Sequence, residues 1–399
     1  MRRDFILMKI SIREIHNQLS QQLHPFSETS SLDTQVLLAH YLEKPRSWIL
    51  AHPEAPLNKT QYNNIIQAAD RLMHGEVLPY IIGHWEFYGM DFHLTPAVLI
   101  PRPETELLVE RGINWLRQHL TRRKAVDVGT GSGCIGITLV KNIPDLQVLL
   151  MDISSAALMV ARDNAEKYDV MGRTKFKQAD LLEGVSGPFD LICANLPYIP
   201  SSLLSILPVA KREPHLALDG GLSGIKVISR LLEQSRSKLL TGGLMLLEIE
   251  SSQGLAVKTL AKAHFPNSKV QILKDLSGLD RCLEIERPGL IIHICPHDDW
   301  LHAYRRGIFQ DQSLLQDGYI HCSQSGQILE VANRFYQGSL DLVLLWVDPD
   351  RLTSELRWET ADNTQFLHIY GPINLDAITS VTELKPDIDG IYRVVQSPD

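Results

Sequence analysis

Residues 124–152 read KAVDVGTGSGCIGITLVKNIPDLQVLLMD and decide the fold of the central part of this chain. The stretch opens with β-branched residues, breaks into glycines and continues with a periodic apolar segment, which predicts a strand, a glycine loop and a helix. Such glycines let backbone N–H groups approach a ligand at the start of a helix. A second apolar run ends on Asp152, which is placed to accept hydrogen bonds from ribose hydroxyls. The stretch therefore predicts a nucleoside cofactor held at the carboxyl edge of a sheet.

The composition limits the class of protein. A chain of 399 residues favours two or three domains. No apolar run approaches the roughly 18 residues that cross a bilayer. The apolar segment that follows the basic residues at the start is too short for a signal peptide, and Met8 is a second candidate start. Five scattered cysteines without a C-x-x-C pair indicate reduced thiols, and a net charge of −8 argues against general binding to nucleic-acid phosphates. We expect a cytoplasmic protein that acts without a membrane or direct contact with nucleic acid.

The first part of the chain has helical periodicity. Residues 11–23, 31–42 and 61–74 carry apolar side chains at three- and four-residue spacing. This predicts a small helical domain over residues 1–88, whose function is either packing alone or docking of a partner. The N-terminal helix caps are expected at Ser30, Ser31 and Asp33.

A connector follows the helical part. It alternates like a strand around residues 87–94 and then reads PRPETE over residues 101–106. The prolines stiffen this segment because each fixes its own φ and restricts the preceding residue. Glu104 and Glu106 are expected either to charge the first turn of the next helix or to belong to a rigid lid beside the cofactor or substrate. The residues alone favour neither alternative.

Strands and helices alternate over residues 124–287. This alternation predicts an α/β domain, with a mostly parallel sheet covered by helices on both faces. A turn-like segment, and not a helix, separates the last two strands, so the final strand is expected to run antiparallel. The strands are predicted over residues 125–128, 148–151, 175–178, 189–194, 244–248, 270–274 and 282–286.

The fourth predicted strand runs into Asn195-Leu196-Pro197-Tyr198. Ligands bind at the carboxyl edge of such sheets, where the side-chain carbonyl of Asn195 and the backbone carbonyl of Leu196 can accept both hydrogens of a planar –NH₂ group. Tyr198 offers an aromatic face to stack on the plane of that group. This arrangement suits methyl transfer to an amide or aryl-amine nitrogen, a poor nucleophile that gains from fixed orientation and from stabilisation of its developing charge.

Several motifs occur in order along residues 9–287. They are Phe87-Tyr88-Gly89, residues 99–106, residues 127–133, Asn195–Tyr198, Glu213-Pro214 with residues 217–221, Leu247-Glu248-Ile249 and Gln253-Gly254. With these motifs, residues 9–287 resemble the release-factor glutamine N5-methyltransferases, the PrmC/HemK group. The resemblance implies a class I S-adenosylmethionine-dependent methyltransferase domain over residues 89–287, preceded by a helical domain that binds release factors. It implies methylation of the glutamine in the Gly-Gly-Gln motif of peptide-chain release factors, with S-adenosyl-L-methionine as the cofactor.

The resemblance also implies roles for individual residues. Asn195 and Tyr198 are the expected catalytic residues, and the substrate glutamine is expected on Asn195, Leu196, Pro197 and Tyr198. The methionine portion of the cofactor is expected along the glycine loop, the ribose on Asp152, and the adenine near Asp180 or Leu181. The complete set expected to bind the cofactor is Gly129, Thr130, Gly131, Ser132, Gly133, Asp152, Asp180, Leu181 and Asn195, and no metal is expected.

The chain departs from the family pattern at two places. Leu196 stands where the family usually has proline, which removes rigidity but keeps the backbone carbonyl. Residues 278–281 read GLDR where GRDR is usual, away from the expected chemistry. Two alternatives remain: an N6-adenine methyltransferase acting on nucleic acid, suggested by Asn-Leu-Pro-Tyr, and an NAD-dependent oxidoreductase, suggested by the G-x-G-x-x-G pattern that begins at Gly131.

The pattern restarts after Pro288-Gly289, which predicts a C-terminal α+β domain over residues 289–399. His293, Cys295 and His297 alternate along a predicted strand and, with His321 and Cys322, are residue types that bind zinc. We favour histidines of a core or a site over a zinc centre, because no second tight pair of ligands follows.

A second set of residues characterises the C-terminal part: His293, Trp300, residues 318–323, Trp358-Glu359 and residues 368–375. With these residues, residues 290–396 resemble a family of small bacterial domains of unassigned function, distantly related to ADP-ribosyltransferases. The resemblance implies either an NAD-binding pocket or a non-catalytic interaction module. The residues expected to line such a pocket are His293, Tyr319, His321, Glu359 and His368.

Overall fold

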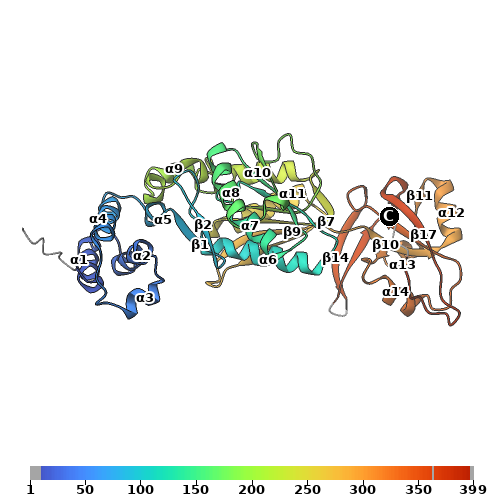
Figure 1. Ribbon diagram of the computed structural model, residues 1–399. Helices are drawn as coiled ribbons and strands as arrows, with labels where there is room; N and C mark the ends of the chain where they lie inside the picture. The colour runs from blue at the N-terminus through green and yellow to red at the C-terminus, as the bar shows by residue number, and fades with distance from the viewer. Residues whose placement is uncertain (1–9, 362–363, 396–399) are drawn as a thin grey trace, which may run out of the picture.

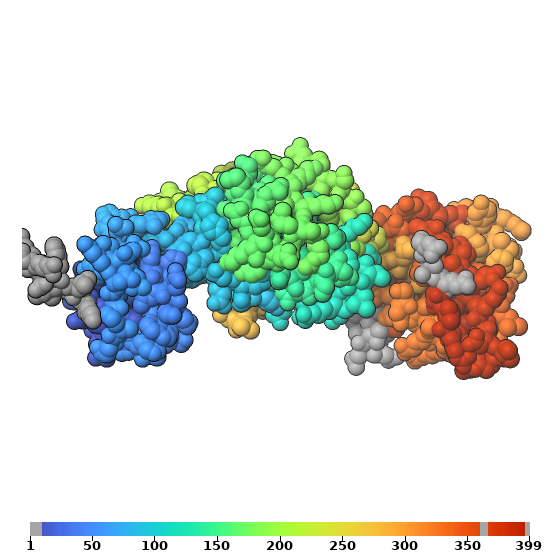
Figure 2. Space-filling view, in the orientation of Figure 1, coloured from blue at the N-terminus to red at the C-terminus, as the bar shows by residue number. Residues whose placement is uncertain are grey.

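A computed structural model describes residues 10–361 and 364–395 of the chain. The first residues, which we judge unsuited to a signal peptide, and the alternative start at Met8 lie outside the described residues. Figure 1 shows three parts in chain order: a helical part, a central sheet with helices on both faces, and a mixed C-terminal part. Figure 2 shows the first and last of these at opposite ends of the central part. No helix among the described residues has both the length and the apolar composition needed to cross a membrane.

The helical part confirms the three predicted helices and adds two short ones. Ser11 caps the first helix through a reciprocal pair of hydrogen bonds with Glu14. Leu19, Leu37 and Ile65, from three different helices, meet in a common apolar core. The helices are α1 (Ile12–Leu23), α2 (Ser30–Leu42), α3 (Arg46–Ala51), α4 (Lys59–Met73) and α5 (Leu78–Ile82).

The predicted caps of the second helix were wrong. The residue that precedes α2 is Thr29, so Ser30, Ser31 and Asp33 all lie inside the helix. The Asp33 carboxylate accepts hydrogen bonds from the hydroxyls of Ser27 and Thr29, at 2.5 and 3.2 Å, and so fastens the chain that enters the helix. Thr29 has φ −109° and ψ 30° and makes no side-chain cap hydrogen bond, so α2 begins without the cap that the run of cap-forming residue types predicted.

The connector forms a hairpin and a short helix in place of the single strand expected around residues 87–94. Strands β1 (His84–Phe87) and β2 (Met90–His93) pair antiparallel across a turn at Tyr88 and Gly89, which both have positive φ. The chain then passes through the 3₁₀ helix η1 (Pro103–Thr105) into α6 (Glu106–Gln118).

The central sheet has seven strands in the order β5-β4-β3-β6-β7-β9-β8. The seven predicted strands are confirmed, although β7 begins earlier than expected. The strands from β5 to β7 are parallel, and β9 runs antiparallel, as predicted. Its place between β7 and β8 was not predicted. The strands are β3 (Lys124–Val128), β4 (Gln147–Asp152), β5 (Thr174–Gln178), β6 (Phe189–Ala194), β7 (Leu239–Glu248), β8 (Lys269–Lys274) and β9 (Asp280–Glu286).

Successive residues of the central strands enter two different apolar cores. Ala125 packs with one core and Val126 with the other, because side chains alternate between the faces of a strand. One core includes residues of α6, α7 and α8, and the other includes residues of α10 and α11. The sheet is therefore buried on both faces. The helices and 3₁₀ turns of this part are α7 (Cys134–Asn142), α8 (Ser155–Lys167), η2 (Met171–Arg173), α9 (Ser201–Leu204), η3 (Pro208–Lys211), η4 (His215–Ala217), α10 (Lys226–Ser235), η5 (Ser251–Gln253) and α11 (Gly254–His264).

The C-terminal part combines three small antiparallel sheets with helices. Their strand orders are β10-β13-β17, β12-β15-β14 and β11-β16. It contacts the central part where the Asn267 amide donates to the Pro349 carbonyl at 2.9 Å and where Arg287 pairs with Asp350. The strands are β10 (Ile291–Pro296), β11 (Ile308–Phe309), β12 (Ile320–Cys322), β13 (Leu342–Val347), β14 (Glu355–Ala361), β15 (Thr364–Tyr370), β16 (Ile373–Asn374) and β17 (Ile378–Leu384). The helices are α12 (His297–Arg306), α13 (Gln312–Gln316), α14 (Ile328–Phe335) and η6 (Leu375–Ala377).

A buried ion pair fastens α6 to the sheet. The Glu284 carboxylate on β9 is buried and accepts hydrogen bonds from the Arg111 guanidinium and, at 2.6 Å, from the Gln271 amide. We expect Arg111→Ala to lower the free energy of unfolding by about 3 kcal/mol, because it leaves a buried carboxylate without its cation. Arg117→Ala, on an exposed position of the same helix, serves as the matched control. Urea unfolding followed by circular dichroism tests this, and equal midpoints for the two variants would contradict it.

Candidate functional site

The loop between β3 and α7 is held by the buried carboxylate of Asp127. Its Oδ2 accepts hydrogen bonds from the Thr130 hydroxyl at 2.6 Å and the Gly136 amide at 3.0 Å. Burial raises the pKa of Asp127 to about 6. Gly129 has a φ of 73°, and a Cβ at this position would lie 3.1 Å from Cδ2 of Leu196. The glycine loop therefore runs directly against the chain that leaves β6.

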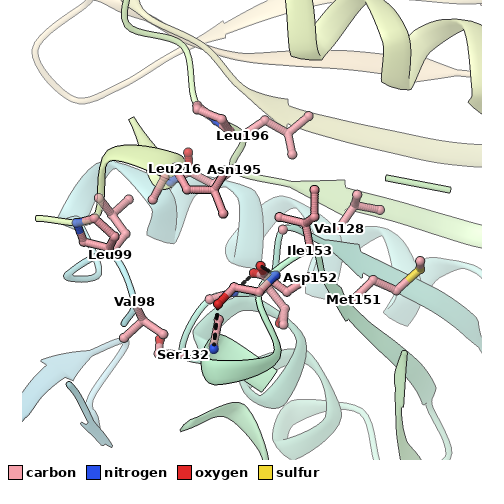
Figure 3. Close-up of a pocket in the computed structure, with 18 of the residues that line it drawn as sticks. Val98, Leu99, Val128, Ser132, Met151, Asp152, Ile153, Asn195, Leu196 and Leu216 are labelled. Atoms are coloured by element: carbon pink, nitrogen blue, oxygen red, sulfur yellow. Dashed lines mark hydrogen bonds between the residues drawn. The ribbon is translucent and has the colours of Figure 1, made fainter. Parts of the chain in front are cut away.

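Asp152, the last residue of β4, fastens the other side of the glycine loop. Its carboxylate accepts hydrogen bonds from the amides of Gly131 at 3.0 Å and Ser154 at 2.9 Å (Figure 3). Burial raises the pKa of this carboxyl above its ordinary value. Asp152 thus connects the loops that follow two adjacent parallel strands.

A cavity of about 500 Å³ opens at this edge of the sheet. Figure 3 shows Asp152 between Ser132 on one side of the cavity and Asn195 and Leu196 on the other. Gly133 and Tyr198 are not among the lining residues: Gly133 precedes α7, and the Tyr198 hydroxyl donates to Glu248 at 3.3 Å. The predicted site residues that do line the cavity are Gly129, Thr130, Gly131, Ser132, Asp152, Asp180, Leu181, Asn195, Leu196 and Pro197.

Two hydrogen-bond acceptors of the tetrapeptide 195–198 are unengaged. Neither Oδ1 of Asn195 nor the backbone carbonyl of Leu196 accepts a hydrogen bond from the residues that the structure describes. The Asn195 amide nitrogen donates to the Thr105 hydroxyl at 3.1 Å, and the Tyr198 carbonyl accepts from the Gln253 amide at 2.9 Å. The tetrapeptide is thus fixed by its other polar groups, while these two oxygens remain available to a ligand.

Sequence reasoning missed two buried residues behind Asn195. The Thr105 hydroxyl donates to Oε2 of Glu248 at 2.5 Å, and Glu248 is the last residue of β7, next to β6. Burial raises the pKa of Glu248 to about 7, against the opposing effect of its hydrogen bonds from Thr105 and Tyr198. The available signal was an acidic residue that ends an apolar strand at the same sheet edge as the tetrapeptide.

The segment at residues 97–105 forms another wall of the cavity. Leu99, Pro101 and Thr105 line it, and the buried Glu213 carboxylate ties the segment down by accepting from the Ile100 amide at 3.1 Å and from Arg102. Glu106 lies in the first turn of α6, as one of the two predictions has it, whereas the action of this segment as a lid stays a prediction. Glu106 also accepts a hydrogen bond from the Tyr88 amide at 2.8 Å.

Four of the five residues expected to line a C-terminal pocket lie together. Tyr319 stacks on His368 at 4.2 Å between ring centroids, and His321 lies 5.1 Å from His368. The Nδ1 atom of His368 lies 2.7 Å from the Glu359 carboxylate. These side chains share one face of the β12-β15-β14 sheet because His321 and His368 are directly opposite in the strand pairing. Whether they form a ligand pocket stays a prediction.

His293 is buried apart from this group. Its Nδ1 lies 2.8 Å from the His321 carbonyl and its Nε2 lies 3.3 Å from Asp311. Although burial acts in the opposite direction, His293 holds the pKa of Asp311 well below its usual range. His297 begins α12, so it does not continue the strand alternation of His293 and Cys295. Among the described residues, no three His, Cys, Asp or Glu side chains are arranged to hold a metal ion.

Comparison with known proteins identifies the parts of the chain. Residues 14–83 match a family model described as the PrmC N-terminal domain, and residues 105–205 match the methyltransferase small domain. A release factor glutamine methyltransferase of Moorella thermoacetica is 42% identical over 257 residues, which cover 64% of this chain and 90% of that protein. The chain belongs to the release factor glutamine methyltransferase family. A relative from Coxiella burnetii is 33% identical and matched over 99% of its length.

The C-terminal part lies beyond this family. Residues 294–381 match the model of a protein of unknown function (DUF952), which confirms the resemblance to a small domain of unassigned function. The distant relation to ADP-ribosyltransferases stays a prediction. Protein CC0527 of Caulobacter crescentus is a solved structure with 33% identity, covering 26% of this chain and 93% of its own, at a TM-score of 0.25. A ribosomal protein L11 methylase of Lactobacillus delbrueckii subsp. bulgaricus is 25% identical over 49% of this chain and 84% of its own, at a TM-score of 0.36.

Family membership makes this chain a methyltransferase that uses S-adenosyl-L-methionine, and the NAD-dependent oxidoreductase is set aside. The cavity fits that cofactor. Its volume falls within the range of small-molecule sites, its glycine loop lies at a helix start, and Asp152 stands at the adjacent strand end.

The close contact at Gly129 gives a testable prediction. We expect Gly129→Ala to destabilise the loop by about 1–2 kcal/mol, since its backbone has the left-handed conformation, and to weaken binding of S-adenosylmethionine by pushing Leu196 into the cavity. Gly172→Ala is the control, because its backbone is unstrained and a Cβ there meets nothing within 4 Å. Isothermal titration calorimetry measures the affinity of each variant for S-adenosylmethionine. Equal affinities in the two variants would refute the role of the contact between Gly129 and Leu196.

Proposed function

We propose that this chain methylates N5 of the glutamine side chain in the Gly-Gly-Gln motif of peptide-chain release factors, with S-adenosyl-L-methionine as the donor. The observation that carries the proposal is the pair of unengaged acceptors, Asn195 Oδ1 and the Leu196 carbonyl, on the wall of the cavity beside the glycine loop. The related proteins named above carry the name of this activity.

The substrate amide is held by these two oxygens. Each accepts one hydrogen of the –NH₂ group, so the nitrogen is oriented by both and cannot rotate about its C–N bond. As the nitrogen attacks, positive charge develops on it, and the same two oxygens stabilise that charge until one N–H proton is released to water. The cofactor would supply the methyl group from its sulfonium, which would leave as a neutral thioether. Only backbone geometry is required at position 196, so leucine serves in place of the family's proline.

Tyr198 adjoins Pro197, which lines the cavity, but does not line the cavity itself. We assign its ring to stacking on the amide plane of a substrate glutamine held at Asn195 and Leu196, and its hydroxyl, which donates to the Glu248 carboxylate, fixes the ring in place. Burial, with the neighbouring Glu248 second, raises the pKa of the Tyr198 hydroxyl, so it stays protonated at neutral pH. Tyr198 therefore acts through its ring and not as a general base.

The cofactor is assigned to the other half of the cavity. The methionine portion would lie along Gly129, Thr130, Gly131 and Ser132, with Gly133 leading into α7 beside it, and the ribose hydroxyls would meet Asp152. The adenine lies near Asp180 and Leu181, where Asp180 is held by an ion pair with Arg230 at 2.8 Å. Arg230 also lines the cavity, so this ion pair limits the width of the adenine end.

The same proposal gives each part of the chain a role and names the protein partner. Residues 1–88 bind the release factor, residues 89–287 carry the chemistry, and residues 289–399 form a separate domain. Separate apolar cores support these boundaries, and a small cluster that includes Tyr80 and Val98 joins the first two. We place the protein in the cytoplasm, where release factors act and where its five cysteines, all free, stay reduced.

Mass spectrometry of a purified release factor tests the activity. After incubation with the enzyme and S-adenosylmethionine, we expect the Gly-Gly-Gln glutamine to gain the mass of one methylene group. Asn195→Ala should lower the rate about 100-fold or more, because it removes an acceptor that stabilises the transition state. Asn114→Ala, at an exposed position of α6, should leave the rate unchanged.

Two outcomes would overturn the proposal. One is an unmodified glutamine in every release factor tested while the cofactor binds normally. The other is transfer of labelled methyl to adenine in RNA or DNA, as the N6-adenine alternative requires.

A further inference from the structure

We propose that Thr105 and Glu248 are positioning residues that fix which way round the Asn195 amide lies. This inference deepens the proposed function and rests on it. An asparagine side chain presents either its oxygen or its nitrogen when the amide turns over, and the two orientations have nearly the same shape. Only the orientation with Oδ1 toward the cavity offers an acceptor to the substrate –NH₂ group. The reverse orientation would place the Asn195 –NH₂ group opposite the substrate –NH₂ group, and two donors facing each other would prevent binding.

The hydrogen bonds behind Asn195 run in one direction. The ionised Glu248 carboxylate can only accept, so the Thr105 hydroxyl must donate its single hydrogen to Oε2, at 2.5 Å. The Thr105 oxygen then has only lone pairs left, and it accepts from the Asn195 nitrogen at 3.1 Å. With its –NH₂ group taken in this way, Asn195 presents Oδ1 to the cavity.

Burial makes this arrangement firm. Thr105 and Glu248 are 2% and 1% exposed, so water is kept from competing for their hydrogen bonds. The Tyr198 hydroxyl donates to the second carboxylate oxygen at 3.3 Å, which leaves both oxygens of Glu248 occupied as acceptors. One carboxylate thereby fixes both side chains of the tetrapeptide that are expected to meet the substrate.

Protonation of Glu248 would release this control. A protonated carboxyl can donate to Thr105, whose hydroxyl is then free to donate to Asn195 Oδ1 after the amide turns over. The groups that face Glu248 are Arg281, which favours its ionised form, and Glu104, which disfavours it, besides the partly buried thiol of Cys134 and the buried thiol of Cys282. Since burial raises the pKa of Glu248 to about 7, the change falls near neutral pH.

Substitution of Thr105 tests the relay. We expect Thr105→Val to lower kcat about 10- to 100-fold, the effect of losing one buried hydrogen-bond partner, with little change in affinity for S-adenosylmethionine. Thr105→Ser keeps the hydroxyl and should restore most of the rate. Thr259→Val, at an exposed position of α11, is the control for the substitution itself. A Thr105→Val enzyme as fast as wild type would overturn the relay.

The pH profile gives a second and independent readout. For wild type, kcat/KM should fall as pH drops below about 7, whereas Glu248→Gln, which cannot change its charge, should lose this acid limb. Stability should move in the opposite direction. A raised carboxyl pKa favours the folded state at low pH, and this contribution is lost as pH rises through about 7. A merely structural role would make activity follow stability.

The outcomes separate the two proposals. If wild type methylates no release factor, the proposed function fails. If wild type is active but Glu248→Gln keeps the acid limb, the relay fails while the function stands. Glu110→Gln, at an exposed position of α6, controls for the loss of one carboxylate. If the Thr105→Val variant does not fold, the pH profile of the nearly isosteric Glu248→Gln variant still tests whether Glu248 controls the orientation of the Asn195 amide.

Discussion

The site depends on the parallel pairing of β3 with β6. Val128 and Ala194 are direct partners in this register, so the next residues, Gly129 and Asn195, leave the sheet side by side. Parallel strands deliver their carboxyl ends to the same edge, which is why two loops distant in the chain share one cavity. A slip of the register would separate the glycine loop from the tetrapeptide and remove the cavity wall that each provides.

Four carboxylates, three of them buried and that of Asp152 half-buried, then fix the loops that this pairing brings together. Asp127 holds the glycine loop from within, Asp152 joins it to the loop after β4, Glu213 fastens the segment before α6, and Glu248 lies behind Asn195. Each accepts hydrogen bonds from backbone amides or hydroxyls, which compensates for burial of the charge. Burial also raises the pKa values of Asp127 and Glu248 to about 6 and 7, so the site carries groups that change protonation near neutral pH.

The C-terminal part is physically attached to the catalytic part but adds nothing to its cavity. The residues that line the cavity range from Ala97 to Arg230, within the described chain. The attachment includes polar contacts between described residues, such as Asn267 with Pro349 and Arg287 with Asp350. Polar contacts of this kind resemble those between domains that keep their own cores. The fused domain therefore has its own set of grouped histidines and tyrosines, separate from the methyl-transfer chemistry.

The sequence by itself determined the order of strands and helices, the glycine loop, the tetrapeptide and the antiparallel last strand. These are local signals: periodicity, glycines at fixed spacing, and a polar residue at the end of an apolar run. Tertiary structure alone decided that Thr105 lies between Asn195 and Glu248, and that Glu213 holds the segment at Ile100. It also decided that Thr29, and not its neighbours, precedes α2. The hydrogen bonds of Thr105 and Glu213 join residues far apart in the chain, and the start of α2 depends on the backbone conformation at Thr29. A local sequence pattern predicts neither feature, because both depend on how the elements pack.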